Sequence, residues 1–407
     1  MPHPDPTTAP AAAPASNVVA TASADALRAL IRRKSRLKGR QPEDASLQQV
    51  RLLLGPAPAD GYRRDLLIEY LHLLNDHFGC LHDHHLVALA REMRLPMAEV
   101  FEVASFYHHF DIVRGDEAAP GLTVRVCDSL ACSMAGAQDL LARLPVLLGA
   151  GRDGNGVRVL AVPCVGRCEQ APVVVVHQQP VPLATPEAVA ALVFKENRAL
   201  AHNSHAQAAI NFVASDWAEK SVSPPPQTTD MVPAFTGYAA YRAQGGYRLA
   251  AALAAGEVDA EGLIQAMENS GLRGLGGAGF PAGRKWRIVR DQPGPRLMAV
   301  NIDEGEPGTF KDRVYLERDP HRFLEGVLIA AQLVGVDACY LYLRDEYHGC
   351  RALLQAELAR LRADPPCGLP QIELRRGAGA YICGEESAMI ESIEGKRGEP
   401  RMRPPYI

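Results

Sequence analysis

Four cysteines in the first half of the chain have the residue type and the spacing to hold a metal centre. Cys127 and Cys132 form a C-x4-C pair, and Cys164 and Cys168 form a C-x3-C pair. Each pair lies where a strand-like run gives way to a loop, so the four thiolates could converge on one point. Four thiolates are the ligands of a [2Fe-2S] cluster. The spacing is not the plant-type C-x4-C-x2-C, because Ala135 follows where a third cysteine would stand.

Three alternative roles for these cysteines compete with the cluster. A four-cysteine zinc site more often has C-x2-C knuckles. Disulfides suit an oxidising compartment, and the start of the chain lacks the pattern of a secretory signal. Unrelated core cysteines would seldom form two such pairs. Four of the remaining cysteines are scattered and show no ligand spacing: Cys80, Cys339, Cys350 and Cys367. Glycines surround Cys383, which is therefore expected to be a small buried residue.

The second half of the chain contains a glycine-rich segment at residues 270–286. Gly274, Gly276 and Gly279 match G-x-G-x-x-G, in which bare backbone amides can approach a pyrophosphate. The residues before it, 264–270, are predicted as helix rather than strand. An ordinary Rossmann fingerprint is therefore not indicated.

Two further segments follow in order. Residues 301–323 crowd acidic and amide groups into a turn-rich stretch. Residues 377–401 place their glycines around a carboxylate pair, Glu385 and Glu386. Any one of the three segments alone would be read as an ordinary loop. Three in sequence, downstream of a metal-binding pattern, favour a nucleotide site.

The hydrophobic pattern predicts helices before the first cysteine pair. Residues 25–119 are expected to form a small helical bundle. Helices are predicted at 63–79, 84–94 and 97–110, and the His-rich run 82–85 is expected to be an exposed helix start. The apolar stripe of the first helix is predicted to be Leu66, Ile68, Tyr70, Leu71, Leu73 and Leu74.

Residues 120–199 alternate strand and helix patterns and predict a small α/β domain that carries all four spaced cysteines. Its strands are LTVRVCDS, VRVLAVPCV and APVVVVHQQ, and its first helix is AGAQDLLARLPVLL. Thr185 should cap the closing helix, with Pro186 at the first helical position. Residues 200–231 are a plausible linker, and residues 232–407 form a third, α/β region.

The bulk composition excludes several classes of protein. The 407 residues carry a net charge of -4, which gives no reason to expect nucleic acid or an anionic membrane as the main partner. No apolar run approaches the roughly 20 residues needed to span a bilayer. Residues 1–24 are rich in Ala, Pro and Thr, and we expect them to be a disordered leader on a cytoplasmic protein.

The cysteine-bearing half resembles the thioredoxin-like [2Fe-2S] subunit of respiratory complex I. The resemblance covers about residues 45–197 and is carried by VRVCDSLAC and VPCVGRCEQAPVV, with SFYHHF upstream. It implies that Cys127, Cys132, Cys164 and Cys168 ligate the cluster. The three later segments resemble the NADH-oxidising flavoprotein subunit of complex I, and GAGAYICGEESAMIES is their most specific part.

The second resemblance implies an FMN and nicotinamide site. Its residues would be Gly274, Gly276, Gly277, Gly279, Phe280, Lys285, Asn301, Asp303, Glu304, Gly384, Glu385 and Glu386. Of these, Phe280 should stack against NADH, Lys285 should meet the FMN phosphate, and the three glutamates are predicted as catalytic. Leu275 departs from the family, which usually has Arg at this position.

The presence of both modules in one chain narrows the resemblance further. The modules are normally separate chains in complex I, but they are fused in NAD-reducing hydrogenase diaphorases and in the beta subunits of NAD-dependent formate dehydrogenases. GLRGLGGAGFP, RDEYHGC and PRLMAVNIDEGEPGTFKD are most similar to the formate dehydrogenase subunits. This implies a diaphorase that carries [2Fe-2S], FMN and NAD(H). Its partners would be a molybdenum- or tungsten-pterin alpha subunit and other iron-sulfur subunits.

Several alternatives and one expectation about completeness accompany this hypothesis. A hydrogenase diaphorase or a complex I subunit would share the same motifs, while a non-catalytic [2Fe-2S] carrier or a zinc-stabilised interaction protein would bind no flavin. The family resembled here continues past residue 407 with a helical bundle that holds a [4Fe-4S] cluster. No C-x2-C-x2-C run occurs in the chain, so we expect a truncated FMN/NAD-binding domain without the [4Fe-4S] ligands.

Overall fold

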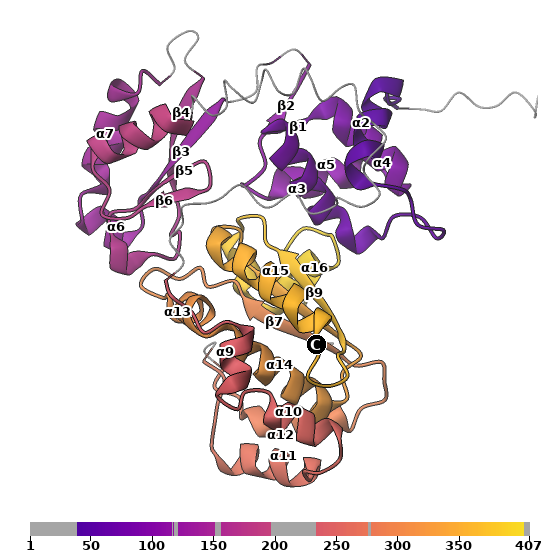
Figure 1. Ribbon diagram of the computed structural model, residues 1–407. Coiled ribbons are helices and arrows are strands. Elements are labelled where there is room, and N and C mark those ends of the chain that lie inside the picture. Colours follow the sequence, from indigo (N-terminus) through magenta and orange to yellow (C-terminus); the bar gives the residue numbers. More distant parts are fainter. Residues whose placement is uncertain are drawn as a thin grey trace, which may run out of the picture. The chain divides into compact units, whose positions relative to one another are not determined.

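The computed structural model (Figure 1) describes residues 39–115, 117, 121–150, 156–196, 233–275 and 278–402. The predicted leader 1–24 and linker 200–231 lie outside these residues, as do Gly276 and Gly277. Residues 42–407 form one compact unit. Within the described ranges, no helix is long and apolar enough to cross a membrane.

The first described part is helical, as predicted. It contains α2 (Asp44–Leu54), the single turn η1 (Arg64–Leu66), α3 (Leu67–Phe78), α4 (Asp83–Met93), α5 (Met97–Phe106) and the short parallel strands β1 (Leu81–His82) and β2 (Ile112–Val113). Gly79 ends α3 in the left-handed conformation at φ 75°, the usual helix stop. Helix α5 ends before the predicted residue 110, because Tyr107 is extended and buried. Its hydroxyl donates to the Lys396 carbonyl at 2.8 Å.

Two predictions about exposure in this helical part were wrong. Leu73 is 44% exposed, and the buried side chain beside it is His72, whose Nε2 lies 2.9 Å from the Gly377 carbonyl oxygen. The run 82–85 is not an exposed helix start either. His85 is 2% exposed, with its Nε2 2.8 Å from the Gln49 side-chain oxygen. In both cases a hydrogen bond to a distant residue allows the imidazole to be buried.

The helical part shares its hydrophobic core with the end of the chain. Leucines and valines of α2 to α5 pack together with Tyr342, Ala378, Cys383, Met389 and Ile393. Cys383 is buried at 1% exposure, as its glycine-rich surroundings predicted. The helices therefore pack against the C-terminal α/β region, which the sequence pattern did not indicate.

The cysteine-bearing domain is an α/β fold around a four-stranded sheet. Its elements are β3 (Leu122–Cys127), α6 (Leu130–Met134), α7 (Ala137–Leu147), β4 (Val157–Val162), η2 (Cys168–Gln170), β5 (Val174–Val176) and β6 (Gln179–Val181). The strand order is β4-β3-β5-β6, with β3 and β4 parallel and the other pairs antiparallel. Residues 186–196 are helical, and the Ala188 amide donates to Thr185 Oγ1 at 3.2 Å, which confirms the predicted N-cap.

The C-terminal region is built on a parallel three-stranded sheet in the order β7-β8-β9. Its elements are α9 (Tyr238–Ala243), α10 (Arg248–Ala254), α11 (Ala260–Asn269), α12 (Ala282–Arg290), β7 (Leu297–Ile302), α13 (Lys311–Arg318), α14 (Pro320–Val334), β8 (Ala338–Leu343), α15 (His348–Ala363), β9 (Gln371–Arg376), η3 (Tyr381–Gly384) and α16 (Glu386–Ile393). Apolar side chains of α14 and α15 form a core with β8 and β9.

The register of this sheet brings three chain segments to one edge. Ile302, Leu343 and Arg376 are aligned as the last residues of their strands. The turns that follow, at 303–310, 344–347 and 377–380, therefore leave the sheet on the same side. In open parallel sheets, ligands bind at the carboxyl ends of the strands. Helix α11 precedes the glycine-rich segment, which confirms that no strand leads into it.

Candidate functional site

The four spaced cysteines come together at one end of the four-stranded sheet. Cys127 is the last residue of β3, Cys132 lies in α6, and Cys164 and Cys168 flank the turn after β4. The sulfurs of Cys164 and Cys168 are 3.4 Å apart, too far for a disulfide, and all nine cysteines, each in the described part of the chain, are free thiols. Cys127 lies near enough to Cys132 and Cys164 for both thiols to affect its pKa, which is raised, with the contact to Cys132 as the largest cause.

Two backbone amides donate to this group of sulfurs. The Gly166 amide donates to Cys164 Sγ at 3.4 Å. Both residues belong to the turn 164–168, here called the cysteine loop. The Gly308 amide, from the turn after β7, donates to Cys168 Sγ at 3.1 Å. The sulfur contact with Cys127 lowers the pKa of Cys132, so this thiol is the first of the group to ionise. Amide donors and an ionisable thiol suit sulfurs that carry negative charge.

The end of β7 and the turn after it contain the predicted residues Asn301, Asp303 and Glu304. The Asn301 side-chain amide donates to the Gly384 carbonyl at 2.8 Å, and the Asp303 amide donates to Asn301 Oδ1 at 3.0 Å. A side chain at Gly384 would place its Cβ 3.2 Å from the Asp303 carbonyl oxygen. The turn and the glycine-rich end of η3 are thus in close backbone approach, which a glycine permits. Burial raises the pKa of Asp303 to about 7.

Glu304 is held inside the protein at the start of α13. Its carboxylate accepts from the Asp312 amide at 3.0 Å and the Tyr347 hydroxyl at 2.9 Å, and the residue is only 6% exposed. Glu385 is the N-cap of α16, with the amides of Ser387 and Ala388 both 2.9 Å from its carboxylate.

Glu386, the first residue of the same helix, is exposed. The three predicted glutamates therefore differ in surroundings: Glu304 and Glu385 receive backbone amides at helix starts, and Glu386 faces outward.

The predicted glycine loop lies between α11 and α12 and closes on itself. The Gly274 amide donates to the Phe280 carbonyl at 2.9 Å, and Gly279 has φ 62°. Phe280 is 41% exposed, and Lys285 is exposed on the first turns of α12. The structure therefore groups the predicted residues in two places, this loop and the edge formed by β7 and η3.

Comparison with protein families finds one matching family for the cysteine-bearing part of the chain and another for the C-terminal part. Residues 57–196 match the thioredoxin-like [2Fe-2S] ferredoxin family, and residues 267–407 match the Nuo51 FMN-binding domain. The chain joins a thioredoxin-like [2Fe-2S] domain to an FMN-binding domain.

Known proteins are similar to this chain over part of their own length. The alpha subunit of the NAD-reducing hydrogenase HoxS of Cupriavidus necator is 32% identical over 363 residues, which are 85% of this chain and 58% of that protein. The mitochondrial 51 kDa subunit of NADH-ubiquinone oxidoreductase from Neurospora crassa is 45% identical over 157 residues, which are 35% of this chain and 32% of that protein.

A solved NAD+-reducing [NiFe]-hydrogenase in its H2-reduced state matches with a TM-score of 0.64 at 30% identity, over 84% of this chain and 56% of that one. The chain thus spans less than two thirds of the length of these proteins.

The residues of both domains fit the cofactors that their families imply. In the [2Fe-2S] domain, four converging sulfurs with amide donors suit the thiolate ligation and hydrogen bonding of such a cluster. In the FMN-binding domain, the side-chain amide of Asn301 and the backbone carbonyl of Asp303 lie beside the backbone of Gly384 at the carboxyl edge of the sheet.

The residues that join the two domains were missed in the sequence. Arg344, at the end of β8 and 5% exposed, donates to the Cys164 carbonyl at 2.6 Å and also to the Glu304 carbonyl. Arg313 donates to the Gly166 carbonyl at 3.1 Å and forms an ion pair with Glu169. The partners of these two arginines in the cysteine-bearing domain are 144 to 180 residues away in the chain, so no local pattern could have shown them.

Proposed function

We propose that this chain is a diaphorase subunit that exchanges electrons between NAD(H), FMN and a [2Fe-2S] cluster. The observation that carries the proposal is the double contact of Arg344. One guanidinium nitrogen donates to the carbonyl of the cluster ligand Cys164, and another donates to the carbonyl of Glu304 in the predicted flavin turn. A cluster domain that only carried electrons elsewhere would not need this buried link to the FMN-binding domain.

A bound FMN supplies the chemistry that connects hydride exchange with NAD(H) to single-electron exchange with an iron-sulfur cluster. The chain's own residues bind and orient the reactants. Gly274 and Gly279 contribute no side chains to the loop before α12, and Lys285 supplies a positive charge for a phosphate. Phe280 offers an exposed ring for stacking on a nicotinamide. We assign no proton transfer to these residues.

The three predicted glutamates divide into different roles in this proposal. Glu304 is a positioning residue, because its carboxylate is already bound by the amides of α13 and by Tyr347. Glu385 shapes the start of α16 next to Gly384. Glu386, which is exposed, is the one whose carboxylate faces outward for a ligand such as a ribose hydroxyl.

The proposal is tested by purifying the protein and measuring iron, sulfide, flavin and NADH-dependent ferricyanide reduction. We expect about two iron and two sulfide per chain, FMN on reconstitution, and NADH-dependent reduction of the dye. A protein with the cluster but without FMN binding or NADH-dependent activity would be the simple electron carrier instead. A colourless protein with stoichiometric zinc would refute both.

We further propose that the physiological partner is the metal-pterin alpha subunit of an NAD-dependent formate dehydrogenase. The similarity of GLRGLGGAGFP and PRLMAVNIDEGEPGTFKD to that family supports it. The second candidate, an NAD-reducing hydrogenase, is favoured by the relative in Cupriavidus necator that matches this chain across both domains. Pull-down from the native cells distinguishes them: formate-dependent NAD+ reduction by the recovered complex supports the first, and hydrogen-dependent reduction supports the second.

A further inference from the structure

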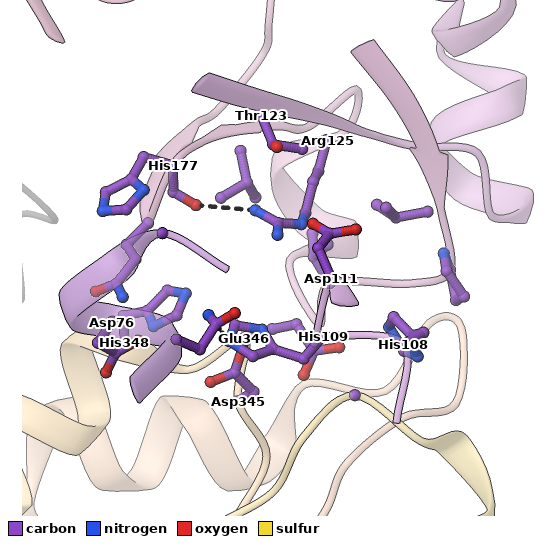
Figure 2. Close-up of a pocket in the computed structure, with 18 of the residues that line it drawn as sticks. Asp76, His108, His109, Asp111, Thr123, Arg125, His177, Asp345, Glu346 and His348 are labelled. Carbon is purple, nitrogen blue, oxygen red and sulfur yellow. Dashed lines mark hydrogen bonds and ion pairs between the residues drawn. The ribbon is translucent and has the colours of Figure 1, made fainter. Parts of the chain in front are cut away.

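A cavity of about 440 Å³ lies beside the cysteine loop and contains none of the predicted flavin-site residues (Figure 2). Val162, Pro163 and Val165, on either side of Cys164, form one wall. The opposite walls come from the end of α3, from His108 and His109, and from the turn after β8. The volume is in the range of sites that take small organic molecules.

The charges around this cavity leave one arginine without an acidic partner. The four carboxylates of the lining are each paired with an arginine: Asp76 and Asp345 with Arg376, Asp111 with Arg158, and Glu346 with Arg344. Arg125 extends from β3 into the cavity in Figure 2 and forms no ion pair with any residue that the structure describes. Its guanidinium donates to the His177 carbonyl at 3.3 Å. Burial lowers the pKa of Arg125, as expected for a charge that lacks a close counter-ion.

One imidazole in the same lining also has a nitrogen without a partner in the described part of the chain. His348 is 8% exposed, and its Nδ1 has no hydrogen bond within the described part of the chain. Such a buried polar atom is unfavourable unless something binds it. His108 and His177 line the same cavity. These groups are suited to an acceptor that carries negative charge.

We propose that this cavity binds a small organic anion. Arg125 holds its phosphate or carboxylate group together with the neighbouring imidazoles, and Val162, Val165 and Val175 pack against its apolar body. The site is separate from the flavin and nicotinamide residues, and no motif in the sequence indicated it.

The same charges argue against the other candidate here, a metal ion. His72, His109 and Asp345 offer one donor atom each, all within 4.8 Å of one another. Yet Arg376 Nε lies 2.6 Å from an Asp345 oxygen, and Arg351 lies 3.5 Å from the same oxygen. Two guanidinium groups at the carboxylate disfavour a divalent cation and favour an anion nearby.

An anion in the cavity also acts on the cluster, because Pro163 and Val165, the two chain neighbours of Cys164, line the cavity. A negative charge next to the cluster favours its oxidised form and lowers its reduction potential. By linkage, reduction of the cluster weakens anion binding by the same factor. This consequence depends on the [2Fe-2S] cluster of the proposed function, whereas the binding itself does not.

The test is calorimetry on the purified protein with FMN and saturating NAD+ present, so that the nucleotide site is filled. Phenyl phosphate and benzoate are the probes for the two anionic groups. We expect one of them to bind and Arg125→Gln to weaken binding about tenfold or more, since a charged hydrogen bond is lost. The matched control is Arg143→Gln, which removes the same charge from an exposed ion pair with Asp139. This variant should bind the probe with the affinity of the parent protein.

His108→Gln is a second variant, at a cavity residue outside β3. It should also weaken binding of the probe, and this result cannot come from misfolding of the strand that carries Arg125. Iron content and visible absorption show that each variant keeps its cluster. The bound probe should shift the cluster potential to a more negative value in the parent and not in Arg125→Gln. Absence of binding by both probes overturns the proposal, and so does equal affinity of the parent and Arg125→Gln.

Discussion

Replacement of Arg344 by Gln should destabilise the protein strongly, because this side chain is buried between three acceptors. It donates to the carbonyls of Cys164 and Glu304 and to Glu346 Oε2 at 3.0 Å, and it is 5% exposed. Removing one member of a buried charge pair costs about 3–5 kcal/mol, since the other charge is left uncompensated. Glutamine can keep at most part of the bonding. We therefore expect the free energy of unfolding to fall by about 3–5 kcal/mol.

Urea unfolding followed by far-ultraviolet circular dichroism measures this change at pH 7.5. The control is Arg143→Gln, whose side chain is 54% exposed and pairs with an exposed carboxylate, so its removal should cost under about 1 kcal/mol. Amide hydrogen exchange gives a local readout. In Arg344→Gln, exchange should rise in residues 164–168 and 303–308, while α7 stays protected. A loss below about 1 kcal/mol with unchanged exchange at both segments would show that Arg344 does not join them.

Three further predictions concern single residues. Cys164→Ser should lose iron and visible absorption, whereas Cys367→Ser, outside the cysteine group, should keep both. Gly166→Ala should lower the melting temperature and the cluster content, because Gly166 has φ 71° and its new Cβ would lie 2.5 Å from the Tyr347 ring; normal iron content and stability would contradict this packing. The pKa of Asp303 is about 7 in the folded protein, against 3.8 for an ordinary aspartate, so the folded protein keeps a proton that the unfolded chain releases between these two values. The stabilisation that this proton gives the folded state is therefore complete below pH 3.8 and is lost as the pH rises to 7. Asp303→Asn should flatten the decline of unfolding free energy over that range, and an unchanged slope would refute the raised pKa.

Local signals in the sequence predicted the elements that carry the cysteines. The alternating run LTVRVC is β3, and Thr185 caps the closing helix through its hydroxyl. The absence of a strand before the glycine-rich loop was also predicted, since α11 occupies that stretch. These features depend on period and capping, which neighbouring residues determine.

The residues that the sequence did not predict depend on partners far away in the chain. His72 and His85 are polar and would be placed at the surface by residue type. They are buried because Gly377 and Gln49 meet their imidazoles. Arg344 begins the run RDEYHGC, but that run gives no sign of its partners, and the role of Arg344 follows only from the carbonyls of Cys164 and Glu304. Such contacts arise from tertiary packing, and a single sequence contains no local trace of them.

Three contacts between the two domains share one chemical direction. The FMN-binding domain donates from Gly308 to the Cys168 sulfur, from Arg313 to the Gly166 carbonyl and from Arg344 to the Cys164 carbonyl. A fourth link runs the other way, because Arg167 pairs with Glu317 at 3.8 Å. Donors aimed at sulfurs and at their neighbouring carbonyls stabilise negative charge on the loop. A reduced [2Fe-2S] cluster carries one more electron than an oxidised one, so these donors would stabilise the reduced form of a cluster bound by the four cysteines.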